Sequence, residues 1–178
     1  MGEAAEGALE SRDALIAVHV YDRVFPAQAI AHLNALAAAA PDGAVSIRPG
    51  EDNRGLYKLL ATITDHANQT IFRFALTGVD EPLEIATRTP ASGDDGWSVD
   101  IGPGSRAARK LTLVIPLSDP AAYDGGDLQA FYEHEPLPVA MPLGRIAVFP
   151  SYVLRRIAPV TRGVRRDLFV RVGGPPYR

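Results

Sequence analysis

The chain has no cysteine, no long hydrophobic run and no excess of positive charge. The lack of cysteine excludes disulfides, zinc–thiolate sites and thiol nucleophiles together. Because no apolar run approaches the roughly 20 residues of a membrane-spanning helix, we expect no membrane partner. The first twelve residues are small and acidic, whereas a secretory signal begins with basic residues and continues with apolar ones. These absences predict a cytoplasmic protein.

The charge balance gives no general attraction to nucleic acid. Lys and Arg number 18 against 21 Asp and Glu, for a formal net charge of −3. One cluster near the C-terminal end could still form a basic patch: Arg155, Arg156, Arg162, Arg165 and Arg166. Alternation along strands would divide this cluster between interior and surface. We therefore expect no nucleic-acid partner.

The length of 178 residues suits one well-buried domain rather than two. The composition is 47% hydrophobic and 22% charged, which is ordinary for a globular protein and leaves no reason to expect a largely disordered chain. We expect residues 1–12 to be a disordered N-terminus and residues 13–178 to form a single domain.

The N-terminal third predicts one strand and two helices. Ala14–Val20 is apolar and predicts a strand. Pro26 then suits the first turn of a helix over Ala27–Ala40, which the Pro-Asp-Gly sequence at 41–43 would end. A second amphipathic helix is predicted over Arg54–Ala67. Its apolar stripe consists of Leu56, Leu59, Leu60 and Ile63.

From Thr70 onwards the hydrophobic period changes to two. Phe72, Phe74 and Leu76 alternate with other residues and predict a half-buried strand. Loops are predicted at Pro90–Gly96 and Phe131–Pro138. Further strands are predicted at Leu83–Thr87, Lys110–Leu117, Ile146–Phe149 and Leu168–Val172. Helices followed by many short strands predict a sandwich, a barrel or a jelly roll, and the pattern alone does not choose among them.

Several phrases in the second half are similar to one enzyme family at matching intervals. The chain resembles the Fe(II)/2-oxoglutarate-dependent dioxygenases, in particular their small prolyl-hydroxylase-like bacterial branch, from about Phe72 to the end. The resemblance implies a mainly β fold, a double-stranded β-helix (jelly roll) with the N-terminal helices packed on one sheet. The phrases that carry it include GWSVDIGPG at 96–104, YDGGDL at 123–128, FPS at 149–151 and PVTRGVR at 159–165.

The resemblance also locates the metal ligands of the family, and two of them differ here. These enzymes bind iron through two histidines and one carboxylate, as His-x-Asp on one strand and a distal histidine. The corresponding residues in this sequence are Ser98, Asp100 and Arg155. Arginine does not lose its proton in proteins and so cannot ligate iron. We expect no Fe(II) and no resident metal, with Asp100 left as the vestige of the site.

Asp100 and Arg155 should converge where the family holds its metal. A buried carboxylate without a partner is costly, and we therefore expect these two side chains to form an ion pair in place of iron. The alternative is that Arg155 turns out to solvent and that Asp100 is hydrated. Both residues are candidate catalytic groups.

Arg165 matches the arginine that binds the far carboxylate of 2-oxoglutarate in the family. Its planar fork suits a carboxylate, so 2-oxoglutarate stays open as a co-substrate and no other cofactor is expected. Asp167, Phe169 and Arg171 alternate with Arg165, so all four should face inward together, unless Arg171 lies at the rim. Trp97, Ser98 and Arg171 are further candidate ligand-binding residues.

Two other features depart from the family pattern. The strand that usually carries pocket-lining tyrosines reads Glu84–Arg88 here, and Arg171 stands where the family has tryptophan. The histidines are His19, His32, His66 and His134. None lies on the strands that carry the motif, although His134 could reach a cleft from its predicted loop.

These residues support three functional hypotheses. In the first, the protein binds a small anionic or polar ligand and catalyses a metal-independent, non-oxidative step such as cyclisation, elimination or isomerisation. Asp100 would then be the acid/base or electrostatic group, with Arg155 and Arg165 clamping the ligand. In the second, it is a catalytically inactive ligand-binding domain or a partner of a homologous subunit or of its own copy. In the third, it is an oxygenase with an unusual metal site.

Overall fold

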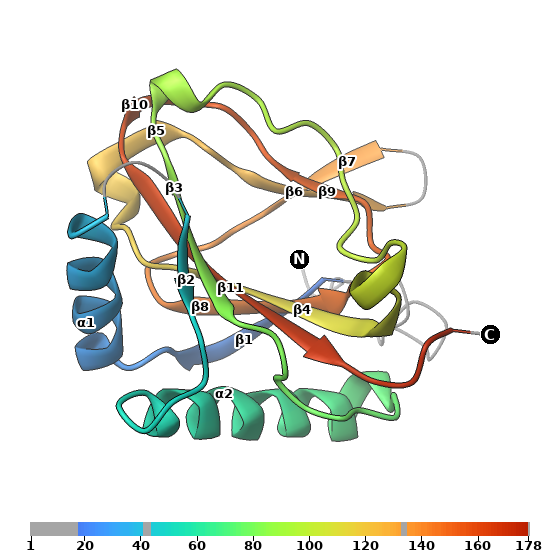
Figure 1. Ribbon diagram of the computed structural model, residues 1–178. Coiled ribbons are helices and arrows are strands. Elements are labelled where there is room, and N and C mark those ends of the chain that lie inside the picture. Colours follow the sequence, from blue (N-terminus) through green and yellow to red (C-terminus); the bar gives the residue numbers. More distant parts are fainter. Residues whose placement is uncertain (1–17, 41–43, 133–134, 178) are drawn as a thin grey trace, which may run out of the picture.

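The computed structural model describes residues 18–40, 44–132 and 135–177. Two β layers face each other, with two helices outside the larger layer (Figure 1). The larger sheet has six strands in the order β1-β8-β4-β11-β3-β2, and all neighbours are antiparallel. Its strands are β1 (His19–Val24), β2 (Val45–Ile47), β3 (Leu83–Arg88), β4 (Arg109–Pro116), β8 (Arg145–Pro150) and β11 (Arg165–Gly173).

The opposite layer consists of two smaller sheets. One pairs β5 with β10, and the other has the order β7-β6-β9. The strands are β5 (Tyr123–Gly125), β6 (Leu128–Tyr132), β7 (Glu135–Val139), β9 (Arg155–Ile157) and β10 (Val160–Gly163). This arrangement is a jelly roll, which confirms the predicted mainly β fold.

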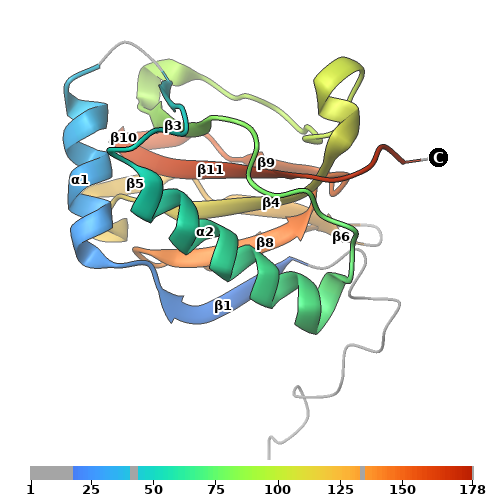
Figure 2. The ribbon, with the colours of Figure 1, turned by 60° about the horizontal axis from the view of Figure 1, so that its bottom comes forward.

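Both predicted helices are present and cover the larger sheet, as expected. Helix α1 (Ala27–Ala38) follows Pro26, whose fixed φ suits a helix start. Helix α2 (Arg54–Ala67) has the predicted bounds and presents the buried Leu60 to the core. Figure 2 shows α2 crossing the larger sheet, with α1 at one side. The helix ends at Ala38, two residues before the predicted end, and the residues predicted to end it, 41–43, lie outside the described residues.

The larger sheet is buried on both faces, and this positions the candidate site. On β11, Leu168, Val170 and Val172 belong to the hydrophobic core under the helices. Phe169, between them, belongs to a second core between the sheets. Because side chains alternate along a strand, Arg165, which shares the face of Phe169, points between the two layers.

The strand predicted through Phe72, Phe74 and Leu76 is wrong. A π-helical segment, Asn68–Phe72, continues α2 and ends at Arg73, which has a φ of 55°. The Asn68 side chain then bonds both backbone groups of Phe74, donating from Nδ2 at 2.8 Å and accepting at Oδ1 at 2.8 Å. Such a side-chain bond competes with a β ladder. The alternation of apolar residues that predicted a strand therefore belongs to a turn.

Two other predictions need correction at their bounds. The first strand begins at His19, and residues 14–17 of the predicted strand lie outside the described residues, as do residues 1–12. The predicted loop Phe131–Pro138 is mostly paired, since Phe131 faces Pro136 across β6 and β7. β7 is an edge strand, where proline is tolerated because its missing N–H is not needed. Within the described residues, no helix is long and apolar enough to cross a membrane.

Candidate functional site

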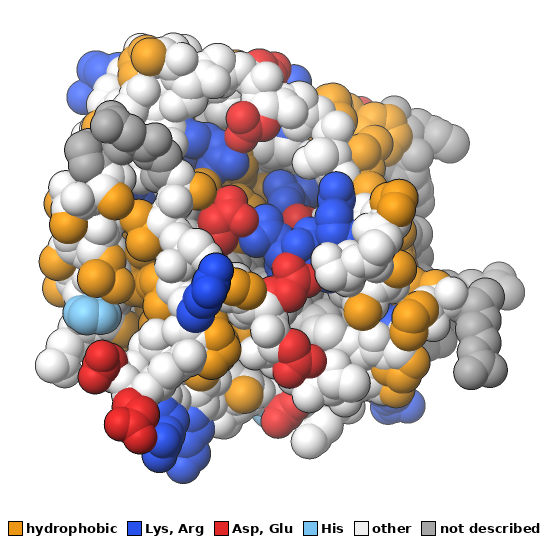
Figure 3. Space-filling model, viewed as in Figure 1, with side chains coloured by type: hydrophobic (Ala, Val, Ile, Leu, Met, Phe, Trp, Pro, Cys, Tyr) orange, Lys and Arg blue, Asp and Glu red, His pale blue; other side chains and the backbone are white. Residues whose placement is uncertain are grey.

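A pocket of about 320 Å³ lies between the two layers. Figure 3 shows charged side chains of both signs gathered around a hollow in the middle of this face. Three carboxylates line the pocket: Glu84, Asp95 and Asp100. Six arginines line it as well: Arg88, Arg106, Arg109, Arg155, Arg156 and Arg171. A positively charged lining in a chain of negative net charge distinguishes this pocket from the rest of the surface.

Asp100 and Arg155 form the predicted ion pair. The Ser98 N–H donates to the Arg155 carbonyl at 2.9 Å, the Arg155 N–H donates to the Ser98 carbonyl at 3.0 Å, and these bonds bring the two segments together. Arg155 Nε then donates to Asp100 Oδ2 at 3.0 Å, and Nη2 donates to Oδ1 at 2.9 Å and to Oδ2 at 2.7 Å. The alternative, with Arg155 turned to solvent, is excluded in this structure.

The pair is buried and Asp100 stays charged. Asp100 is 4% exposed and Arg155 is 7% exposed. Burial alone would raise the pKa of Asp100, but the charge and hydrogen bonds of Arg155, helped by Arg171, hold that pKa below its usual value. A carboxylate stabilised in this way is a poor proton donor or acceptor near neutral pH.

Arg171 joins this pair to a second carboxylate. Its Nε lies 3.4 Å from Asp100 Oδ1, and its Nη1 donates to Glu84 Oε2 at 2.7 Å. The side chain is 13% exposed and lines the pocket, so Arg171 faces inward near the mouth. The guanidinium carbons of Arg155 and Arg171 lie 5.1 and 5.6 Å from the Phe169 ring centre, within cation–π range.

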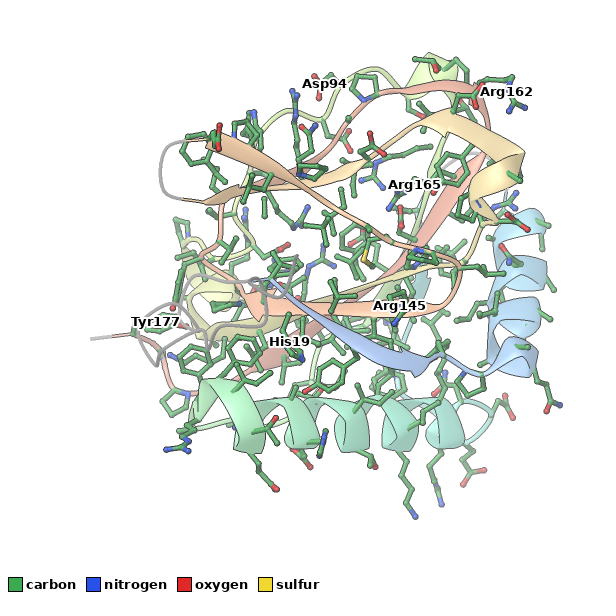
Figure 4. All side chains as sticks on the ribbon, turned by 180° about the vertical axis from the view of Figure 1, so that it is seen from behind. His19, Asp94, Arg145, Arg162, Arg165 and Tyr177 are labelled. Atoms are coloured by element: carbon green, nitrogen blue, oxygen red, sulfur yellow. The ribbon has the colours of Figure 1, made fainter. Side chains whose placement is uncertain are left out.

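Arg165 faces inward as predicted, but it lies outside this pocket. Its Nε and Nη2 each donate to Asp167 at 2.8 Å, and Nη1 donates to the Gly126 carbonyl at 2.5 Å. Arg165 lines a different cavity, together with Tyr123. Figure 4 shows Arg165 between the layers and Arg162 at the outer edge, so the sequence cluster of arginines is divided as expected.

The other two predicted ligand-binding residues, Ser98 and Trp97, lie at different places relative to the pocket. Ser98 lines it. Trp97 is half-buried at the rim, where its ring lies edge-on to Phe131 at 5.8 Å and the Arg156 guanidinium lies 5.0 Å from its centre. The structure therefore brings Ser98, Asp100, Arg155 and Arg171 together, with Trp97 beside them.

Glu84 and Arg88 were missed as candidate residues, although the sequence held a signal for them. Leu83 and Ile85 on β3 are buried in the core under the helices, so the alternating Glu84 and Arg88 must face the pocket. Arg106 gave no such signal. It follows the turn at Gly104, and its Nη2 donates to the Val99 carbonyl at 2.8 Å.

The histidines do not assemble a metal centre with acidic residues in the part of the chain that is described. No three His, Asp or Glu side chains there gather closely enough to hold an ion. His32 and His66 lie on α1 and α2, across the larger sheet from the pocket. His134 lies outside the described residues.

The fold is that of the Fe(II)/2-oxoglutarate oxygenases. A prolyl-4-hydroxylase from Pseudomonas putida superposes with a TM-score of 0.72 over 91% of this chain and 95% of that one, at 19% identity. An oxidoreductase of the 2OG-Fe(II) oxygenase family from Burkholderia pseudomallei gives a TM-score of 0.66 over 99% and 98% of the two chains, at 17% identity. At these identities the likeness concerns the fold.

Sequence similarity points to the same group over a shorter segment. A PKHD-type hydroxylase from Xylella fastidiosa is 39% identical over 74 residues, covering 38% of this chain and 31% of the relative. A PKHD-type hydroxylase from Cupriavidus metallidurans is 38% identical over 66 residues, covering 37% and 29%. The match thus spans about a third of the length of these curated relatives. No protein-family model matches the chain.

Proposed function

We propose that this protein binds a small polar ligand in the Asp100 pocket without iron and does not carry out 2-oxoglutarate-dependent oxidation. The observation that carries the proposal is the buried ion pair between Asp100 and Arg155. The resemblance to the dioxygenases assigns these two positions, with Ser98, to the iron ligands. The guanidinium of Arg155 neutralises the carboxylate that iron would otherwise neutralise.

The residues present do not fit Fe(II). Both carboxylate oxygens of Asp100 already accept hydrogen bonds from Arg155. Arg155 offers no lone pair and repels a divalent ion. The Ser98 hydroxyl would be the one remaining side chain of the three, and one weak oxygen ligand does not replace two imidazoles.

The arginine expected to bind 2-oxoglutarate is also engaged. Asp167 occupies two nitrogens of the Arg165 fork, and the Gly126 carbonyl occupies the third. A 2-oxoglutarate carboxylate would have to displace a carboxylate that is fully buried and two residues away on the same strand. This arrangement supports a protein without the usual co-substrate.

Between binding and metal-independent catalysis, the state of Asp100 favours binding. A charged and paired carboxylate suits an electrostatic role, whereas acid/base work needs a pKa near the working pH. The pocket of about 320 Å³ is at the small end of ligand sites, which suits a small molecule.

Anaerobic calorimetry on the metal-stripped protein tests the proposal. We expect no saturable heat with Fe(II), either alone or in the presence of 2-oxoglutarate. The variant carrying both Ser98→His and Arg155→His should gain Fe(II) binding, because it supplies two imidazoles beside Asp100. Ser98→His alone is the matched control and should not bind, since Arg155 still holds the carboxylate. Tight Fe(II) binding by the wild-type protein would overturn the proposal.

A further inference from the structure

We propose that the ligand carries an oxyanion, either a carboxylate or a phosphate. This anion replaces the carboxylate of Asp95 as the hydrogen-bond acceptor of Arg88. This inference rests on the proposed function and adds the chemical class of the ligand and the residue that selects it. Arg88 lies at the end of β3, and both residues line the Asp100 pocket.

Arg88 has one nitrogen without an acceptor. Its Nε and Nη2 both donate to a single oxygen, Asp95 Oδ2, at 3.0 and 2.9 Å. Its Nη1 is buried and has no hydrogen-bond partner among the described residues. The carboxylate of Asp167 comes no closer to Nη1 than 3.7 Å. A buried donor without an acceptor is unfavourable, and an oxygen of a bound anion would satisfy it.

The two carboxylates near Arg88 differ in how easily they can leave. The Asp95 side chain is 57% exposed, whereas Asp167 is fully buried and bound to Arg165. Water can solvate the exposed carboxylate of Asp95 when it leaves Arg88, so a ligand anion can replace it at small cost. Asp167 cannot be replaced without opening the core. Asp95 therefore serves as an internal competitor for the fork of Arg88.

The surroundings favour an anion over a cation. Arg106 lines the same pocket and bonds only backbone carbonyls, with no carboxylate within ion-pair distance among the described residues. Arg156 donates from Nε to the neutral Gln129 Oε1 at 2.7 Å, and its contact with the Asp94 carboxylate is longer, at 3.6 Å. These guanidinium groups leave positive charge at the pocket once Asp95 moves aside.

Opposite substitutions at the two residues test the exchange. Binding of succinate and of inorganic phosphate to the full chain is measured by calorimetry. The wild-type protein should bind at least one of them, and Asp95→Asn should bind it about two- to fivefold more tightly, because the competing carboxylate is neutral. Arg88→Met should weaken binding at least about tenfold. Arg88→Lys should also weaken it, because lysine keeps the charge and loses the fork.

The exposed pair Arg162–Asp124 supplies the control. It is also an arginine–aspartate pair, it lies outside this pocket, and Asp124→Asn changes the net charge as Asp95→Asn does. Equal tightening by Asp124→Asn, or unchanged binding in Arg88→Met, would overturn the inference and leave the proposed function standing. Failure of the wild-type protein to bind either probe would also overturn it, while the iron titration decides the proposed function separately. A folding defect would weaken binding, so it cannot produce the tighter binding expected of Asp95→Asn.

Discussion

The jelly-roll interior holds two buried arginine–carboxylate pairs of opposite character. Arg155 and Asp100 are 55 residues apart and join two separate segments. Arg165 and Asp167 are two residues apart on one strand. Both pairs form forked hydrogen bonds. The first can form only once the fold has assembled, whereas the second needs no more than an extended strand with both side chains on one face.

The two pairs also differ in what remains available around them. Asp100 borders the pocket and has a second guanidinium, that of Arg171, at 3.4 Å. Asp167 is fully buried and is hydrogen-bonded by Arg165. The long-range pair therefore belongs to a charged network that borders the pocket, whereas the carboxylate of the local pair is fully buried and its second guanidinium, that of Arg88, comes no closer than 3.7 Å. The two pairs also face different cavities, since Arg165 lines the one beside Tyr123 and Asp100 lines the charged pocket.

The largest expected effect comes from breaking the local pair, Arg165 and Asp167. Arg165→Met should lower the free energy of unfolding by about 3–5 kcal/mol, because it leaves Asp167 charged and buried. Denaturant titration followed by circular dichroism measures the change. A loss smaller than that of Arg155→Met would contradict the view that Asp167 depends more on Arg165 than Asp100 depends on Arg155.

Breaking the long-range pair should cost less. Arg155→Met should lower the free energy of unfolding by about 2–3 kcal/mol, because Arg171 remains beside Asp100 and limits the cost of an unpaired charge. The same titration measures it. Adding Asp100→Leu should recover part of the loss, since the double variant buries no charge. Additive losses in the double variant would show that the two side chains are not coupled.

The sequence predicted the long-range pair better than the local one. Strand alternation and the family spacing put Asp100 and Arg155 at one place, and the cost of an unpaired buried charge then implied the pair. Alternation also put Arg165 and Asp167 on one face. It did not show that their side chains would turn toward each other, because a shared face does not fix a rotamer.

The same holds for other elements: hydrophobic patterns in the sequence predict them, whereas hydrogen bonds made by individual side chains do not show in those patterns. The stripe of α2 predicted that helix with its correct bounds. The segment after it was predicted as a strand because the two backbone bonds from the Asn68 side chain to Phe74 leave no trace in hydrophobic periodicity. The inward side of β3, with Arg88, followed from alternation, while its unpartnered nitrogen depends on distances that only the structure gives.

Acid should lower the free energy of unfolding through Asp100, and by less than the substitutions above. The folded-state pKa of Asp100 lies below the unfolded value of 3.8, so the folded protein binds fewer protons in that window. The stabilisation is therefore fully present above the unfolded pKa and is lost as the pH falls through the folded pKa. Unfolding curves recorded at decreasing pH should show this loss in the wild-type protein. Asp100→Asn should remove that part of the pH dependence, and an unchanged profile would contradict the depressed pKa.

The smallest effect is expected at the exposed pair, Arg162 and Asp124. Arg162 Nε and Nη2 donate to the two Asp124 oxygens, so its geometry resembles that of the buried pairs. Both side chains are more than half exposed, however, and water stabilises each charge when the other is removed. Arg162→Gln should therefore leave the denaturation midpoint unchanged within error. A loss comparable to that of Arg155→Met would mean that fork geometry, rather than burial, determines the strength of all three pairs.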